Sequence, residues 1–323
     1  MLQVYPGLLK ILDFALETST KPSLEQILEY QRDWKHMSET CGNSQKWKEC
    51  HQNVSEEFCA DFLSHIAKEE DIGLKDKGAA RALVESTNRE VAQRTRVKRM
   101  KSQEETETRN LLQAWEHLSN MAEKEAQSDP NTLGLLEIDS CVKEVHKILL
   151  QNIKCGTTPG HFSTRERYTE LGYNGERHYY PKFETEEDAE KHVLDKIDTY
   201  NALVSKIKEI QHPLGKISML FKCAAWILFE VISLHPFGNG NGRLCRMLCS
   251  YCLAVFTPFP TPIYNVYSTS TKEDYINAIV ETRKSKPQHP VQLATLIIDS
   301  NCKAWEKFIQ RMREELSDSE NSA

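Results

Sequence analysis

Residues 233–246 read SLHPFGNGNGRLCR and lie between two segments with apolar, helical spacing. Three glycines alternate with two asparagines in this stretch: Gly238, Asn239, Gly240, Asn241 and Gly242. Glycine reaches positive φ freely, and asparagine is among the few other residues that tolerate the left-handed region. The composition therefore predicts a loop that leads directly into a helix. Backbone N–H groups in such a loop, together with the positive end of the helix dipole, form an anion site.

The side chains around this loop fit the chemistry of phosphate transfer. Arg243 and Arg246 stand three residues apart on the predicted helix, so both project from one side and reach successive phosphates. His235, at the entry of the loop, carries an imidazole that accepts a hydroxyl proton near neutral pH. The loop amides and the guanidinium groups hold the charge that shifts during displacement. The segment is suited to moving a phosphate-containing group onto a hydroxyl.

The overall composition indicates a soluble globular protein. Its 323 residues suffice for one large domain or two ordinary ones, with 39% hydrophobic and 27% charged residues. A net charge of −6 argues against a general nucleic-acid-binding surface, and we expect no nucleic-acid partner. The N-terminus lacks the basic region of a signal peptide, and no stretch reaches the roughly 18 apolar residues of a membrane span. We expect no membrane association and a cytoplasmic or nuclear location.

Helical spacing dominates the sequence, so we expect a mainly α fold. The helix expected over residues 214–234 is apolar nearly all round, which puts it at the centre. Turn residues at 159–160, 172 and 174–175, with a short strand candidate at 177–180, predict a β-hairpin within 160–183. The polar stretch 38–53 is predicted to be a loop, and the acidic, serine-rich tail 317–323 to be disordered. The other expected helices span 5–17, 22–37, 55–72, 76–90, 104–126, 135–151, 185–210, 242–256, 271–284 and 289–314.

The loop resembles the signature of the Fic family, HxFx(D/E)GNGRxxR. Residues 235–246 match it at all but one of the specified positions. Residues 159–165 resemble the family's PGxxR segment, and 177–183 fall where its flap hairpin lies. The helix that carries His146, which we expect to be a buried and satisfied histidine, also resembles a family element. The resemblance covers roughly residues 75–300.

This resemblance implies a mainly α, Fic-type helical bundle with a small β-hairpin flap near the active-site loop. It implies a catalytic domain over residues 75–316, with the catalytic loop at 235–246 and the flap at 160–183. Residues 1–74 form an N-terminal helical region of unknown role, outside the resemblance.

The resemblance also implies roles for the loop residues. His235 is the general base that deprotonates the target hydroxyl, and Phe237 anchors the loop in the core. Arg243 contacts the β phosphate of ATP and Arg246 the γ phosphate. Tyr275 is a candidate contact for adenine. The amides implied to bind the nucleotide belong to Gly238, Gly240, Asn241 and Gly242.

The implied enzyme is a protein adenylyltransferase. It moves AMP from ATP to a Ser, Thr or Tyr hydroxyl of a protein and releases pyrophosphate. Its partners are ATP and that protein substrate, whose backbone the flap holds by strand addition. A homodimer is left open.

Asn239 is the one departure from the signature, since the family usually has Asp or Glu there to hold Mg²⁺. An amide oxygen coordinates Mg²⁺ or Mn²⁺ without the charge that such a cation prefers. Asn239 is therefore the candidate metal ligand, with three alternatives open. The metal is held acceptably with help from the phosphates, the donor is a different one such as CDP-choline or another nucleotide, or the chain is a nucleotide-binding module with weak or no catalysis.

Many members of the family are inhibited by a helix carrying (S/T)xxxE(G/N), whose glutamate pairs with the second arginine of the loop. Residues 86–91, within the predicted helix 76–91, resemble this element, although Val91 replaces Gly or Asn. The resemblance implies that Glu90 is inhibitory and pairs with Arg246. The alternative is an ordinary exposed glutamate on a charged helix.

Overall fold

The computed structural model describes residues 8–93, 102–128, 134–171 and 176–318. Within these ranges the chain is mostly helical and has one two-stranded sheet, so the mainly α prediction is confirmed. The helical elements are η1 (Leu8–Leu12), α1 (Thr20–Cys41), α2 (Gln45–Glu69), α3 (Lys77–Gln93), α4 (Gln103–Ser128), η2 (Ile138–Lys143), α5 (Glu144–Leu149), α6 (Glu186–Lys208), α7 (Pro213–Leu234), α8 (Asn241–Ala254), α9 (Lys272–Lys284) and α10 (Val291–Asp318).

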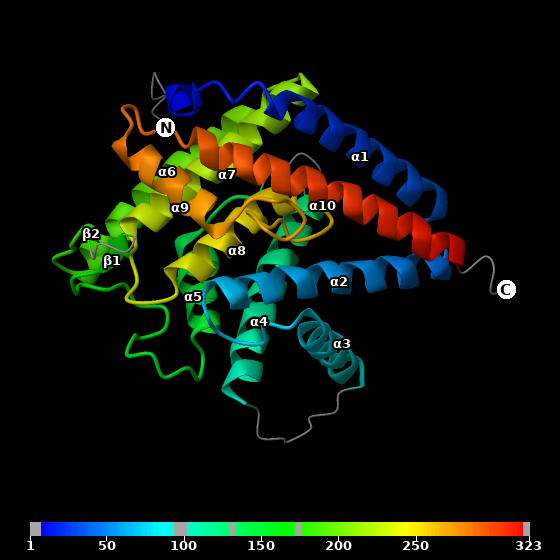
Figure 1. Cartoon of the computed structure of the whole chain (residues 1–323), viewed down its shortest axis with the longest axis horizontal. Coiled ribbons are helices and arrows are strands. Elements are labelled where there is room, and N and C mark those ends of the chain that lie inside the picture. The colour runs from blue at the N-terminus through cyan, green and yellow to red at the C-terminus, as the bar shows by residue number, and fades with distance from the viewer. Residues whose placement is uncertain (1–7, 94–101, 129–133, 172–175, 319–323) are drawn as a thin grey trace.

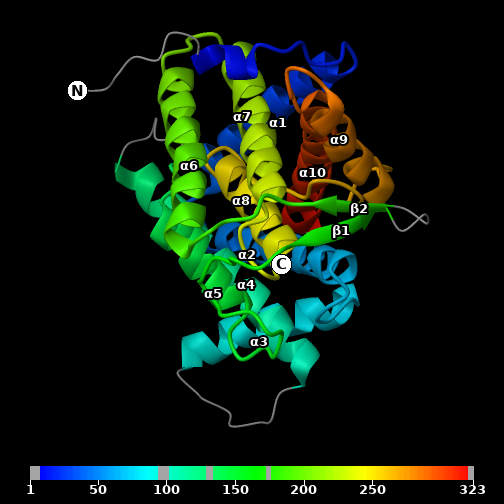
Figure 2. The same ribbon diagram turned by 90° about the vertical axis from the view of Figure 1, so that its left-hand side faces the viewer.

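The helix α7 forms the centre of the bundle, as its apolar sequence predicts. It packs against α6, α8 and α10, and Figure 2 shows α6, α7 and α10 side by side with α8 between them. By length and composition α7 could cross a membrane, but most of its apolar stretch is buried inside the fold, as in a core helix. Burial of most of α7 places its C-terminal end, and therefore the loop that follows, in a rigid frame.

The N-terminal helices share this core. In Figure 1, α1 lies along α10, and α2 passes on the other side of α10. The ring of Phe308 on α10 lies 5.2 Å from that of Trp34 on α1 and 5.3 Å from that of Phe58 on α2. The division expected at residue 74 stays a prediction, but the hydrophobic core runs across it without a break.

Three expected segments differ from the structure. The predicted loop 38–53 is wrong, because α1 continues to Cys41 and α2 begins at Gln45. The Ser44 side chain caps α2 by accepting a bond from the Trp47 N–H at 3.1 Å, and the Trp47 side chain is buried. Local capping and burial therefore outweigh the polar composition of this stretch.

The other two differences lie near the ends of the chain. The helix expected over 5–17 is only η1 within the described residues. The tail expected to be disordered starts at residue 317, but α10 continues to Asp318, and residues 319–323 lie outside the described residues.

The predicted hairpin is present as strands β1 (Tyr168–Leu171) and β2 (Glu176–Tyr179), paired antiparallel with Tyr168 opposite Tyr179. Arg167, just before β1, is buried and holds the base of the hairpin. Its guanidinium donates to the carbonyl of Ser163 at 2.6 Å and to the carbonyl of Pro181. The Ser163 N–H in turn donates to the carbonyl of Pro236 at 2.8 Å, which attaches the flap to the loop after α7.

We predict that Phe308→Ala destabilises the whole chain by about 3–5 kcal/mol, because it opens a cavity where α1, α2 and α10 meet. Urea denaturation followed by circular dichroism measures the change. Leu9→Ala, at a side chain that is 47% exposed, is the matched control and should change stability by less than about 0.5 kcal/mol. A separate early transition confined to the N-terminal helices would contradict the shared core.

Candidate active site

Two left-handed residues shape the loop between α7 and α8. His235 ends α7 with φ 48° and ψ 55°, and Gly240 precedes α8 with φ 82°. A Cβ at Gly240 would lie at ordinary contact distance, 3.4 Å, from the imidazole of His146. The left-handed backbone angle is therefore what favours glycine at position 240.

Reciprocal hydrogen bonds hold the loop closed. The Phe237 N–H donates to Oδ1 of Asn241 at 3.0 Å, and Nδ2 of Asn241 donates to the Phe237 carbonyl at 2.8 Å. The Phe237 ring is fully buried and stacks on His146, with ring centroids 3.6 Å apart. The loop conformation is thus fixed by contacts on both sides of its glycines.

His146 is the brace that connects the loop to the segment before the flap. The Gly160 N–H donates to Nδ1 of His146 at 2.9 Å, so Nε2 carries the proton and donates to the Asn239 carbonyl at 2.9 Å. Both bonds require a neutral ring. Burial lowers the pKa of His146 to about 4, with a smaller contribution from the charge of Arg243. His146 is buried and satisfied, as we expected, and the structure adds which groups satisfy it.

Arg243 is a buried cation that has no acidic partner among the described residues. The residue is 4% exposed, and burial lowers its pKa. Its Nη2 donates to Oδ1 of Asn239 at 3.1 Å, while its buried Nε has no hydrogen-bond partner. A buried guanidinium beside a helix N-terminus has a strong electrostatic preference for an anion.

Arg246, unlike Arg243, has an acidic partner. Its guanidinium forms an ion pair with Glu70, at the end of α2, and donates to the Tyr264 hydroxyl at 2.9 Å. Burial alone would lower the pKa of Arg246, but the Glu70 carboxylate holds it above the usual value. The carboxylate lies so close to Gly242 that a Cβ there would collide with it. Glu70 therefore occupies the position of an anion at the N-terminus of α8.

The structure gives Arg246 an acidic partner other than Glu90, and the inhibitory role of Glu90 stays a prediction. The partner that the structure gives Arg246 is Glu70, in place of Glu90, whose side chain lies outside the described residues. The helix that carries Glu90, α3, packs on α2 and α4, and Arg109 of α4 donates to Oγ1 of Thr87 at 2.9 Å. A sequence signal for Glu70 did exist, because Glu69 and Glu70 lie at the C-terminus of α2, where the helix dipole disfavours carboxylates unless a cation is near.

A pocket of about 300 Å³ brings together His235, Gly242 and Arg246. Tyr275, Glu70 and Arg283 also line it. The phosphate-binding amides predicted from sequence do not all face this pocket. Gly238 lines a separate hollow of about 420 Å³, and the Gly240 N–H is bonded to Oδ1 of Asn239 at 2.6 Å. The Asn241 side chain braces the loop, as described above.

His235 lines this pocket in a defined orientation. Its ring stacks on Tyr180, just after β2, with centroids 3.9 Å apart and an interplanar angle of 12°. Burial lowers the pKa of His235 to about 4, so the imidazole is neutral at pH 7 and is able to accept a proton. Sequence reasoning missed Tyr180 as the residue that orients this ring.

The residues around Asn239 do not fit a divalent metal ion in this arrangement. Its single side-chain oxygen accepts bonds from the Gly240 N–H and from the Arg243 guanidinium. An oxygen that faces a cation is a poor ligand for Mg²⁺, which prefers charged oxygen ligands. The described residues also contain no cluster of three or more His, Cys, Asp or Glu side chains with metal-binding geometry.

We predict that acidification destabilises the chain through His146. An unfolded histidine has a pKa of about 6.5, whereas burial holds that of His146 at about 4. The unfolded state binds more protons between these values, so stability falls as pH is lowered through this window, by on the order of 3 kcal/mol for this residue. His146→Gln should be less stable at neutral pH and lose this part of the pH dependence. Urea denaturation from neutral to acidic pH measures how the free energy of unfolding changes with pH in the unmodified chain and in His146→Gln. The same pH dependence in both would contradict this role of His146.

Comparison with known proteins agrees with the loop signature. Residues 139–253 match the family model described as Fic/DOC family. A ribonucleoside-diphosphate reductase small chain of Ostreid herpesvirus 1 (isolate France) is 27% identical over 175 residues, covering 54% of this chain and 26% of that protein. The chain thus spans about a quarter of the length of that relative. A Fido domain-containing protein of Dictyostelium discoideum is 28% identical over 133 residues, covering 40% of this chain and 83% of that protein.

The fold has counterparts among solved structures. A Fic domain containing signaling protein from Bacteroides thetaiotaomicron aligns with a TM-score of 0.59 at 14% identity, covering 93% of this chain and 97% of that one. This likeness of fold extends over the N-terminal helices as well as the loop at 235–246. Residues 139–253 of this chain therefore match the Fic/DOC family model, in agreement with the loop signature, and the chain shares its fold with a Fic domain containing protein.

Proposed function

We propose that this site transfers AMP from ATP to a Ser, Thr or Tyr hydroxyl of a protein. Fic-family domains generally transfer nucleotide-derived groups to proteins. The observation that carries the proposal is a pair of buried arginines, Arg243 and Arg246, at the N-terminus of α8 beside a neutral His235. Two buried cations at a helix N-terminus suit a polyphosphate, and a neutral imidazole beside them suits proton transfer from a hydroxyl.

In the proposed reaction, Nε2 or Nδ1 of His235 accepts the proton of the target hydroxyl. The hydroxyl oxygen forms a bond to the α phosphorus, and the bond from that phosphorus to the bridging oxygen of pyrophosphate breaks. Arg243 and Arg246 stabilise the negative charge that passes to the leaving pyrophosphate. The stacking of His235 on Tyr180 keeps the imidazole in one orientation during this step.

Glu70 is proposed to keep the site inhibited. Its carboxylate pairs with Arg246 beside Gly242, where a phosphate would make the same contacts. Carboxylate and phosphate would therefore compete for one guanidinium. The neighbouring Glu69 has its own partners, since it accepts a bond from the Tyr264 hydroxyl at 2.9 Å and lies 3.6 Å from Lys272.

A second candidate is a nucleotide-binding module with weak catalysis. The observation in its favour is Asn239, whose oxygen is engaged by Arg243 rather than offered to a metal ion. In that case the chain would bind ATP at the same arginines but transfer AMP slowly or not at all. Transfer from another donor, such as CDP-choline, is the third outcome that the experiment below distinguishes.

We predict that Glu70→Gly and Glu70→Gln each tighten ATP binding by at least about tenfold, which corresponds to about 1.4 kcal/mol. Both variants remove the charge that competes for Arg246. Isothermal titration calorimetry measures the dissociation constant. Glu209→Gln, an exposed glutamate at the end of α6, is the control and should leave it unchanged. Unaltered ATP affinity in both Glu70 variants would refute inhibition by this residue.

We predict that His235→Ala, in the Glu70→Gly background, lowers AMP transfer by about 10²–10⁴-fold while ATP binding stays within about threefold. Incubation with ATP labelled on the α or the γ phosphate, followed by counting of protein-bound label, measures transfer. Retention of α label alone supports AMP transfer, and γ label would indicate a kinase instead. Binding without label supports the nucleotide-binding module, and label from choline-labelled CDP-choline would identify another donor. Loss of ATP binding in His235→Ala would make this residue structural.

A further inference from the structure

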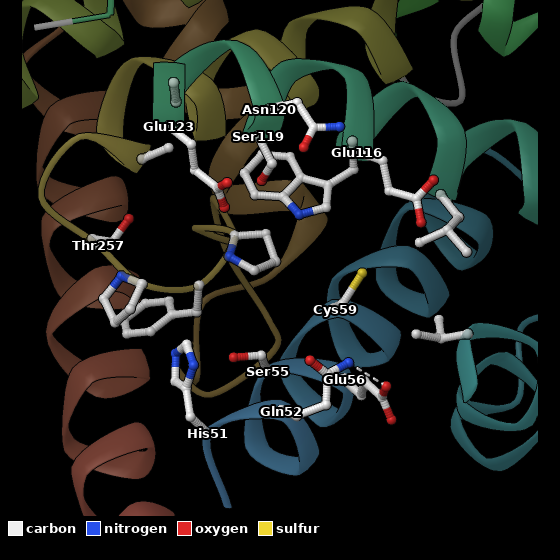
Figure 3. A pocket seen from close by; sticks show the side chains of 18 of the residues that line it. His51, Gln52, Ser55, Glu56, Cys59, Glu116, Ser119, Asn120, Glu123 and Thr257 are labelled. Carbon is white, nitrogen blue, oxygen red and sulfur yellow. Dashed lines mark hydrogen bonds between the residues drawn. The ribbon is translucent and has the colours of Figure 1, made fainter. Parts of the chain in front are cut away.

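A second and larger cavity lies away from the catalytic loop. It has a volume of about 650 Å³ and is bounded by α1, α2, α4 and the connection that follows α8. Figure 3 shows the walls that α2, α4 and this connection form. This volume is within the range of pockets that bind small molecules. None of the loop residues from His235 to Arg246 lines it.

The walls of this cavity are aromatic and acidic. Trp34 and Trp115 line it together with the carboxylates of Glu56, Glu116 and Glu123. Figure 3 shows Glu116 and Glu123 on α4 and Glu56 on α2, around the same space. No lysine or arginine is among the residues that line it. Burial raises the pKa of Glu116, which means that its charge lacks full solvation or a cationic neighbour.

One polar atom in the walls lacks a partner. Nε2 of His51 is buried without a hydrogen-bond partner, and the His51 ring packs against Trp34 and Trp47, with centroids 5.2 and 6.3 Å away. Burial lowers the pKa of His51, so the ring is neutral at pH 7 and adds no positive charge to the walls. An unpaired buried nitrogen of this kind offers a hydrogen bond to a molecule or a water in the cavity.

We propose that this cavity binds a small organic cation, an amine or an amidine with an aromatic or apolar body. Trp34 and Trp115 are among the residues that line the cavity, and the negative π surface of an indole attracts a cation. The carboxylates supply opposite charge, and the same carboxylates repel the polyphosphate of a nucleotide. The cavity is thereby distinguished by charge from the arginine-lined loop, and this proposal does not rest on the proposed transfer activity.

The test uses the full chain and three probes of nearly identical shape: benzamidine, which is a cation, benzamide, which is neutral, and benzoate, which is an anion. Isothermal titration calorimetry should show benzamidine binding at least about tenfold more tightly than benzamide, and no binding of benzoate. Glu116→Gln combined with Glu123→Gln should weaken benzamidine binding by about tenfold or more, while Glu209→Gln should not. Circular dichroism and thermal unfolding show that each variant is folded.

Three results would overturn the proposal. Benzamide or benzoate binding as tightly as benzamidine would show that charge does not select the ligand. Unchanged benzamidine affinity in the folded double variant would place the probe elsewhere. Absence of benzamidine binding up to millimolar concentration would show that the cavity does not take this class of molecule.

Discussion

The guanidinium of Arg246 is a cation that the fold almost entirely removes from water, with 3% of the residue exposed. A buried charge is stable only with an opposite charge and hydrogen bonds around it. Glu70 supplies the charge, and Tyr264 accepts one bond. The positive end of α8 adds to the preference for an anion at this point. In the proposed function the resting and nucleotide-bound states then differ by an exchange of anions at one guanidinium, and the loop is already formed in both.

Because the loop is rigid, an exchange of anions at Arg246 does not require its backbone to rearrange. The reciprocal bonds between Phe237 and Asn241, together with the His146 brace, fix the backbone before any ligand arrives. Preorganised donors stabilise developing charge without the cost of rearranging at the moment of reaction. His146 is neutral because it is buried. The geometry of the loop therefore depends on the packing of the core around this ring.

The sequence predicted those features that depend on local patterns. The apolar period located α7, and the alternating glycines located the turn at Gly240, because helix period and left-handed angles are properties of neighbouring residues. It failed where distant contacts decide. Trp47 is buried by packing that the polar stretch 38–53 does not reveal. The partner of Arg246 lies 176 residues away. The position of Glu70 at a helix C-terminus indicates that a cation is near, but it does not identify Arg246 as that cation.

The ion pair between Glu70 and Arg246 gives the N-terminal helices a physical role. The helix α2 brings Glu70 to the loop, while Phe58 and Phe62 bury its body against other helices. Just after Glu70, the Gly73 N–H donates to Glu107 of α4 at 2.7 Å, so the chain is held on both sides of the carboxylate. A shift of the whole helix would break the shared core. In the proposed function, release of Arg246 is therefore a change confined to the Glu70 side chain or the last turn of α2, which leaves the shared core intact.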